Sequence, residues 1–322
     1  MAKQSTTNNS MKNSSSRPWL ALAVGTAVVG TLPWLVSEFV ASVLLSCLMY
    51  IALATSWSLF CGATRYLSLA TSAFFGIGAY ASATLLGSLP WPLVIVAGAL
   101  IAAVVAVVMG AAVLHLRGTY FAVLTFGMTE LIRHAVTFVE KQVSGTVGRV
   151  LTVVPSNETV YLTVLLIAAA AIATAIAIQR SRFGLALSGI GADEQRAQTL
   201  GVDTRLAKIA GFGITAAFAG AVGAAMAVRW TYIEPAAVFS PFIGFQTVLI
   251  ALIGGAASIG GPVLAAIVFS LLAETLRLQL PYGYMMVLGL LLILCVMYLP
   301  NGLATLWQRK RAATPATEAS HV

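Results

Sequence analysis

The feature that most constrains this chain is a series of uninterrupted apolar runs. Most are about twenty residues long, which is enough for a helix to cross the roughly 30 Å hydrocarbon core of a bilayer. Only helices and closed barrels satisfy their backbone hydrogen bonds in lipid, and barrels show alternating segments of about ten residues instead. Hydrophobic residues make up 59% of the chain and charged residues only 9%, against about 25% charged in a soluble domain. The sequence predicts an all-α polytopic membrane protein.

Ten segments are predicted to cross the membrane. The eighth and ninth are short and are separated by glycines and Pro262, so they form either two short helices or one broken hairpin. The predicted spans cover residues 19–36, 39–60, 66–87, 92–114, 119–138, 159–178, 207–229, 242–257, 259–276 and 282–300.

The distribution of basic residues tests this count, because short cytoplasmic loops are enriched in Lys and Arg. Ten spans with the amino terminus inside place 13 of the 18 basic residues in the cytoplasm, 4 outside and Arg133 within a span. An odd number of spans would put the two basic tails on opposite sides. We therefore expect both termini to be cytoplasmic.

The domain organisation follows from the same pattern. Residues 1–18 are polar and are expected to form a disordered cytoplasmic tail, and residues 306–322 a second cytoplasmic tail. Residues 19–305 form the transmembrane domain. Its first apolar segment is expected to remain as an uncleaved span, because no clear small-residue cleavage site follows it.

The longest internal cytoplasmic loop, residues 179–206, is unusually rich in charge. Asp193 can cap a short helix that ends near Leu200 and stops at Gly201. Ala197 and Leu200 are three residues apart and are expected to share an apolar face. A marginal amphipathic helix of this kind can dock into a groove on a soluble partner. The alternative is an ordinary basic loop that only sets the topology.

The stretch "RSRFG" at 180–184, followed by "DE" at 193–194 and "LG" at 200–201, resembles the coupling loop of the LivH/LivM family. These proteins are permease subunits of ATP-binding-cassette importers for branched-chain amino acids. Other stretches agree in order: "LSLATSAFFGIGAYASATLL" at 67–86, "RGTYFAVLTFGMTELIR" at 117–133, "LIGGAASIGGPVLAAIVFSLLAE" at 252–274 and "LPNGL" at 299–303. The chain is more similar to LivM than to LivH.

The resemblance implies an importer-type permease fold in the bacterial inner membrane, with branched-chain or other small neutral amino acids as cargo. It also implies two ATPase subunits, a second permease chain (LivH-like or another copy), and a periplasmic or extracellular substrate-binding protein. The ATPases would use ATP and Mg²⁺, and no cofactor is expected on this chain. The implied ATPase-coupling residues are Arg180, Arg182, Gly184, Asp193, Glu194, Ala197, Leu200, Gly201 and Lys208.

Charged residues at membrane depth are costly and often line a cavity or meet a partner. Glu130, Arg133 and His134 fall at i, i+3 and i+4 on the fifth predicted span, so they share one face. They form either a structural ion pair or a polar strip on the translocation path. Tyr120 and Thr125 on the same segment complete the candidate path.

Small residues are frequent within the predicted spans and permit close helix packing. The candidate packing residues are Gly76, Gly78, Gly254, Gly255, Gly260 and Gly261.

The residues also argue against other classes of function. No G-x-x-x-x-G-K-[ST] pattern occurs, so ATP hydrolysis by a phosphate-cradling loop belongs to another chain. No nucleophile, general base or metal site is apparent, so an enzyme is not expected. Apart from the protein partners above, membrane lipid is the expected partner, and nucleic acid is not expected. The alternatives are a related permease for urea or short-chain amides, a stand-alone secondary transporter, and a scaffold protein without transport.

Overall fold

The computed structural model describes residues 19–116, 118–151, 154–230, 232–256, 258–280, 283, 286–287 and 289–290. The predicted tails at 1–18 and 306–322, and most of the predicted span 282–300, lie outside the described residues.

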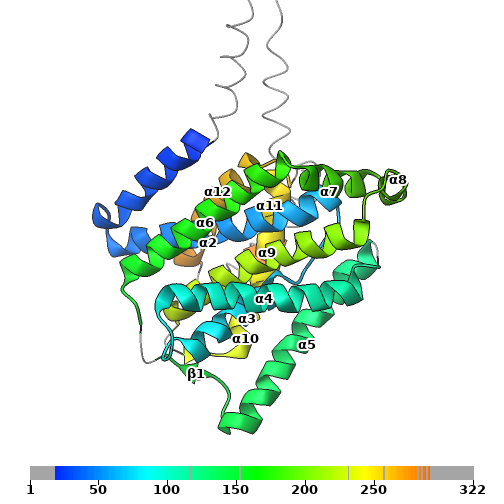
Figure 1. Ribbon diagram of the computed structural model, residues 1–322. Coiled ribbons are helices and arrows are strands. Elements are labelled where there is room, and N and C mark those ends of the chain that lie inside the picture. Colours follow the sequence, from blue (N-terminus) through cyan, green and yellow to red (C-terminus); the bar gives the residue numbers. More distant parts are fainter. Residues whose placement is uncertain are drawn as a thin grey trace, which may run out of the picture.

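The described chain is almost entirely helical (Figure 1). An apolar helical stretch, Trp19–Trp34, ends in the 3₁₀ turn η1 (Leu32–Trp34) and precedes the main bundle. The longer helices are α2 (Glu38–Trp57), α3 (Thr71–Leu85), α4 (Trp91–Val113), α5 (Thr119–Ser144), α6 (Asn157–Gln179), α9 (Thr204–Met226), α11 (Pro241–Gly254) and α12 (Gly260–Gln279). The shorter elements are η2 (Ser58–Gly62), α7 (Arg182–Ala192), α8 (Glu194–Thr199), η3 (Ala227–Arg229), α10 (Pro235–Val238), and the strands β1 (Arg149–Val150) and β2 (Tyr232–Ile233).

Seven helical stretches of the described residues are long and apolar enough to cross a membrane, so the chain is a multi-pass membrane protein. They correspond to seven of the predicted spans and cover Glu38–Gly62, Trp91–Val113, Thr119–Val143, Asn157–Gln179, Thr204–Arg229, Pro235–Gly254 and Gly260–Gln279. The region of the eighth and ninth predicted spans forms two helices, α11 and α12, which are joined by a short turn.

The third predicted span, residues 66–87, is shorter in the structure. Only Thr71–Leu85 is helical, which is 15 residues; at a rise of about 1.5 Å per residue this covers roughly 22 Å. Tyr66 to Leu69 precede the helix without regular structure, because the Trp57 indole donates to the Ser68 carbonyl at 2.9 Å and holds this segment against α2. The apolar run in the sequence is therefore longer than the helix it forms.

Helix α9 lies at the centre of the bundle and packs against α3 and α4. In Figure 1, α2, α4, α6 and α9 run in roughly the same direction across the view. A Cβ on Gly78 would overlap the Gly220 carbonyl, and one on Gly223 would overlap the Phe75 carbonyl. Residues without a side chain therefore permit the close approach of α3 and α9.

The other predicted packing glycines have different surroundings. A Cβ on Gly76 would strike the Phe239 ring, and Gly254 and Gly261 meet at the turn between α11 and α12. Gly255 in that turn has φ +87°, a conformation that favours glycine. Among the described residues, no atom lies within 4 Å of a Cβ position on Gly260, so the close packing expected for it is not seen there.

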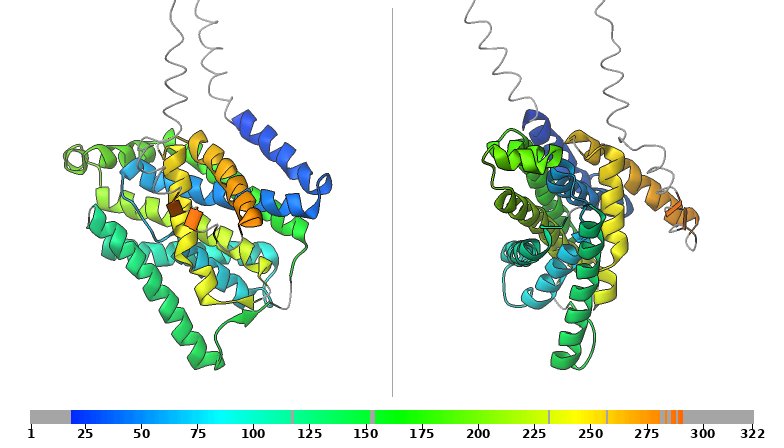
Figure 2. Two further views of the ribbon diagram at one scale, coloured as in Figure 1. Left: turned by 180° about the vertical axis from the view of Figure 1, so that it is seen from behind. Right: turned by 90° about the vertical axis from the view of Figure 1, so that its right-hand side faces the viewer.

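Helix α5 lies at the edge of the bundle and is the least buried of the seven candidate spans. It descends steeply away from the neighbouring helices in Figure 1 and runs beside α11 in the right-hand view of Figure 2. The Phe126 and Phe245 rings join these two helices, with centroids 5.9 Å apart. Much of the surface of α5 is thus left without a neighbour among the described residues.

Candidate coupling site and translocation path

The predicted coupling loop contains two helices and not one. Ser181 begins α7, and its hydroxyl accepts a hydrogen bond from the Gly184 amide. Leu187 and Ile190, three residues apart, are buried on the inner side of α7. This helix was not predicted from the sequence, although its cap residue Ser181 and the apolar spacing of Leu187 and Ile190 are both present there.

Asp193 separates the two helices and begins α8, as predicted. Its side chain accepts hydrogen bonds from the amides of Gln195 and Arg196 at 3.0 and 3.1 Å. Gly201 ends the helix with φ +84°, a left-handed conformation in which glycine is unstrained. The local sequence therefore determines both ends of α8.

Glu194 fastens α8 to the transmembrane helices. Its Oε1 lies 2.6 Å from Nζ of Lys208 in α9, and the two side chains are only 8% and 6% exposed. The Tyr66 hydroxyl donates to Oε2 of Glu194 at 2.8 Å, and Lys208 Nζ also donates to the Leu114 carbonyl at 2.9 Å. The ion pair thus connects the loop to α9, to the segment before α3 and to the end of α4.

Tyr66 is a hydrogen-bond donor to Glu194 in this network. Burial raises the pKa of the Tyr66 hydroxyl above its ordinary value, and its hydrogen bond to Glu194 raises it further. The phenol therefore remains a neutral donor at physiological pH. Lys208 Nζ also lies 4.8 Å from the centre of the Tyr66 ring, within the range of a cation–π contact.

The expected common face of Ala197 and Leu200 is not formed. Ala197 is 4% exposed and packs within the chain, whereas Leu200 is 84% exposed. The short helix ends at Thr199, and Leu200 already belongs to the turn in which the Val202 amide donates back to the Ala197 carbonyl. Helical spacing therefore does not apply to this pair.

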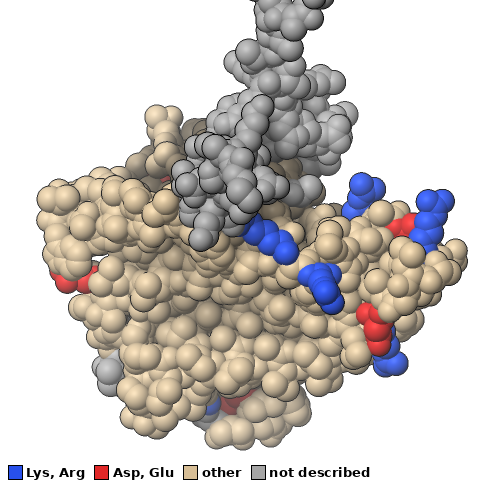
Figure 3. Space-filling view, turned by 45° about the horizontal axis from the view of Figure 1, so that its top comes forward, with Lys and Arg blue, Asp and Glu red and all other residues tan. Residues whose placement is uncertain are grey.

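The remaining predicted coupling residues lie around these helices. Arg180 and Arg182 are exposed at the start of α7, and a Cβ on Gly184 would overlap the Ile178 carbonyl. Figure 3 shows Lys and Arg side chains gathered toward the right, the end of the molecule where Figure 1 places α7 and α8. The predicted coupling residues thus lie together at one basic end of the bundle.

The predicted path residues lie on α5, but Thr125 is buried and does not share a surface with the other four. Arg133 Nη2 lies 2.5 Å from Glu130 Oε2, and His134 Nε2 lies 4.0 Å from the same oxygen. Tyr120 is 77% exposed. Thr125 is buried, where its hydroxyl accepts from the Leu69 amide and donates to the Ala122 carbonyl. Thr125 therefore holds α5 against the segment before α3.

A second buried carboxylate, Glu140, was not singled out from the sequence. It is 4% exposed near the other end of α5 and accepts hydrogen bonds from the Tyr80 hydroxyl at 3.0 Å and the Gly148 amide at 2.9 Å. Arg149 Nε lies 3.3 Å from its Oε1. Arg149 also begins β1, which pairs antiparallel with β2. The only sequence signal was a carboxylate next to an apolar run.

Among the described residues, no cluster of three or more His, Cys, Asp and Glu side chains is placed to bind a metal ion.

The comparisons with known proteins agree with this architecture. The sequence model of the branched-chain amino acid transport system permease components matches residues 39–297, which is most of the chain. The chain belongs to this family. It is therefore the permease component of an importer, a transport subunit and not an enzyme.

Curated relatives of this permease include the high-affinity branched-chain amino acid transport system permease protein LivM of Escherichia coli strain K12. The two are 27% identical over 84% of this chain and 71% of the relative. The LivM protein of Salmonella typhimurium strain LT2 is 26% identical over the same shares. No solved structure matches the permease.

Proposed function

We propose that this permease imports branched-chain or other small neutral amino acids across the bacterial inner membrane, driven by ATP hydrolysis in two separate ATPase subunits. The substrate class is supported by the family and by the names of the two LivM relatives. A second permease chain, LivH-like or another copy, and an external substrate-binding protein complete the proposed assembly. ATP and Mg²⁺ are used by the ATPases.

The observation that carries the coupling role is the buried attachment of α8. One side of α8 is fastened through Glu194 and Lys208, while Leu200 and Arg196 face solvent. Docking on the exposed side would move α8, and the short ion pair would transmit this displacement to α9 and to Tyr66. Arg180, Arg182, Gly184 and Asp193 position the platform formed by α7 and α8.

The proposed orientation places α7 and α8 in the cytoplasm. Ten spans with both termini inside satisfy the basic-residue asymmetry of the sequence. In this orientation Glu140 and the β1–β2 pair lie at the outer surface. The coupling region, residues 179–206, is then cytoplasmic. The amino-terminal and carboxyl-terminal tails lie on the same side of the membrane.

The path is proposed to run along the exposed face of α5. Glu130, Arg133, His134 and Tyr120 supply polar groups on a helix that is the least buried of the candidate spans within the described chain. A second permease chain would close this face.

Replacing Leu200 by Arg tests the docking proposal. The substitution changes the solvent-exposed side of the loop and does not disturb the packing of the bundle. The matched control is Leu89→Arg, which alters an exposed leucine between α3 and α4. We expect Leu200→Arg to reduce ATPase co-purification and uptake together, and Leu89→Arg to retain both. If wild-type protein transports without any ATPase, the chain is a stand-alone transporter. If Leu200→Arg retains the ATPase and uptake, α8 is not the docking element.

A further inference from the structure

The segment from Tyr66 to Leu69 connects the coupling helices with α5. At its beginning, the Tyr66 hydroxyl donates to Oε2 of Glu194 in α8 at 2.8 Å. The ring of the same residue meets the Phe121 ring of α5 edge to face, with the centroids 5.4 Å apart. At its end, the Leu69 amide donates to the Thr125 hydroxyl of α5 at 3.1 Å. This connecting segment, residues 66–69, therefore contacts α8 and α5 at once.

The two contacts on α5 lie on one buried face of the helix. Phe121 and Thr125 are four residues apart, which places them on the same side one turn apart, and they are 0% and 1% exposed. The Thr125 hydroxyl also donates to the Ala122 carbonyl of its own helix at 2.9 Å. Without this hydroxyl the Leu69 amide would lose its acceptor at a partly buried position, which carries a desolvation cost. The contact therefore resists separation of α5 from the connecting segment.

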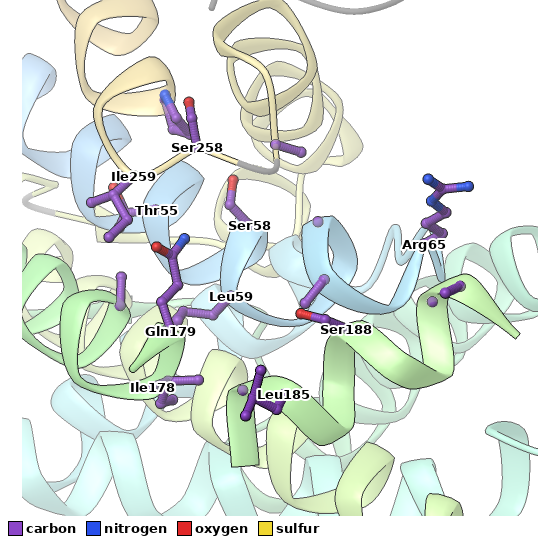
Figure 4. Close-up of a pocket in the computed structure, with 18 residues that line it drawn as sticks. Thr55, Ser58, Leu59, Arg65, Ile178, Gln179, Leu185, Ser188, Ser258 and Ile259 are labelled. Carbon is purple, nitrogen blue, oxygen red and sulfur yellow. The ribbon is translucent and has the colours of Figure 1, made fainter. Parts of the chain in front are cut away.

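The chain just before the connecting segment is in contact with α7. Residues Ser58–Gly62 form the π-helical turn η2, and a Cβ on Gly191 of α7 would overlap the Ala63 carbonyl that follows it. A Cβ on Gly62 would overlap the Ala256 carbonyl in the α11–α12 turn. Figure 4 shows η2, with Leu59, in the wall of a cavity of 440 Å³ that α7 and the α11–α12 turn also line. Both coupling helices thus reach the connecting segment or the turn that precedes it.

Arg65, between η2 and the connecting segment, has an unusual backbone conformation. Its φ is +59°, and no other described residue except glycine has a positive φ. Conformations of this kind persist only where the surroundings hold them, and they cluster at switch regions. Here the contacts of η2 lie on one side and those of Tyr66 on the other. The entry to the connecting segment is therefore determined by its tertiary contacts.

Among the elements attached to α8, α5 has the most room to move. Helix α9 is the most buried of the seven candidate spans, and its glycines bring it into backbone contact with α3. Helix α5 is the least buried of the seven. Its far end is fastened separately, where Tyr80 and Gly148 donate hydrogen bonds to Glu140. A displacement of the connecting segment would therefore tilt the beginning of α5 about its far end.

We propose that the connecting segment transmits ATPase docking from α8 to α5, with Tyr66 and Thr125 as the positioning residues at its two ends. Helix α5 begins at the same end of the bundle as α7 and α8 (Figure 1). Glu130 and Arg133 follow Thr125 by one to two turns on the same helix, so a tilt of α5 displaces them. The proposal rests on the proposed function, namely docking at α8 and a path along α5.

The link itself is tested without any ATPase, by thermal unfolding of the full-length chain in detergent. Tyr66→Phe removes the hydroxyl that bonds to Glu194 and keeps the ring beside Phe121. Thr125→Val removes the acceptor of the Leu69 amide. The matched control is Thr129→Val, because the buried Thr129 hydroxyl donates only to the Thr125 carbonyl of its own helix.

We expect the falls in melting temperature of Tyr66→Phe and Thr125→Val to be less than additive in the double variant, because residues of one network are coupled. The falls of Tyr66→Phe and Thr129→Val should be additive. Additive falls in both double variants would overturn the proposal.

Transmission is tested on the complete importer in proteoliposomes, with labelled leucine as the probe. We expect the leucine imported per ATP hydrolysed to fall about three- to tenfold in Tyr66→Phe and in Thr125→Val, with the ATPase still bound. Thr125→Ser keeps the hydroxyl and should restore the ratio, and Thr129→Val should match the wild type. A wild-type ratio in both Tyr66→Phe and Thr125→Val, or no rescue by Thr125→Ser, would contradict transmission through this segment. If the wild-type chain binds no ATPase, the proposed function fails, while the unfolding experiment still decides whether the link exists.

Discussion

At the scale of single residues, ion pairs within one helix were easier to predict than those between elements. Glu130 and Arg133 are three residues apart, so helical geometry alone brings them together. Glu194 and Lys208 belong to different helices, and Tyr66 is far from both in the sequence. Glu194 was predicted to lie on the docking surface. Its contact with Lys208 could not be predicted, because nothing in the local sequence shows that a lysine of the next span lies close to it.

Lys208→Met should therefore destabilise the protein and weaken coupling. Lys208→Met removes the cationic partner of the buried Glu194 carboxylate, a loss that costs about 3–5 kcal/mol in buried pairs, so the apparent melting temperature in detergent should fall. The control is Arg196→Ala, which breaks the exposed pair with Asp193 and should change stability by about 1 kcal/mol or less. An equal fall in melting temperature for the two substitutions would contradict the proposed role of the buried pair.

Glu130 is tested by two substitutions that separate charge from shape. Glu130→Ala leaves Arg133 without its carboxylate on the exposed face of α5, and uptake should fall strongly. Glu130→Gln keeps the volume and part of the hydrogen bonding, so uptake should fall less. Uptake is measured in cells with matched expression. Wild-type uptake by both variants would remove Glu130 from the path.

At the scale of elements, the sequence predicted the ends of α8 better than the existence of α7. Asp193 and Gly201 are strong local signals for the beginning and end of a helix. In α7 three glycines lower the helix propensity, and the helix forms because Leu187 and Ile190 are buried by the bundle. The π-helical turn at Ser58–Gly62 likewise depends on contacts with α7 and with the α11–α12 turn.

Two glycine substitutions distinguish backbone conformation from packing. A Cβ on Gly201 or on Gly127 meets no atom of the described residues within 4 Å, but Gly201 has φ +84° whereas Gly127 lies within α5. Gly201→Ala should destabilise the protein by about 1–2 kcal/mol. Gly127→Ala should be neutral or stabilising by up to about 1 kcal/mol. Thermal unfolding in detergent measures both, and a destabilisation of the same size in each would contradict the conformational explanation.

At the scale of the whole molecule, the composition of 59% hydrophobic and 9% charged residues predicted a membrane protein, and the length of the apolar runs predicted helices instead of a barrel. The number of spans is harder to predict from the sequence. A hydropathy pattern cannot distinguish a helix from an extended apolar segment, and Tyr66 to Leu69 belong to the second kind. The arrangement of α5 at the edge of the bundle also depends on tertiary contacts that no periodicity reveals.

The proposed topology predicts the location of two reporters. A reporter that is active only outside the cytoplasm should be inactive when fused after Val322 and active when inserted near Glu158, because ten spans place these sites on opposite sides. Expression of both fusions is verified by immunoblotting. Activity at the carboxyl terminus and none near Glu158 would reverse the orientation.

The pairing of β1 with β2 has a consequence for biogenesis. The two strands are separated in the sequence by α6, α7, α8 and α9. Synthesis proceeds from the amino terminus, so β1 emerges from the ribosome without its partner and must wait until all four helices have been made. The final arrangement of the end of α5 is therefore a late event in assembly, and a chain truncated before Tyr232 would leave β1 unpaired.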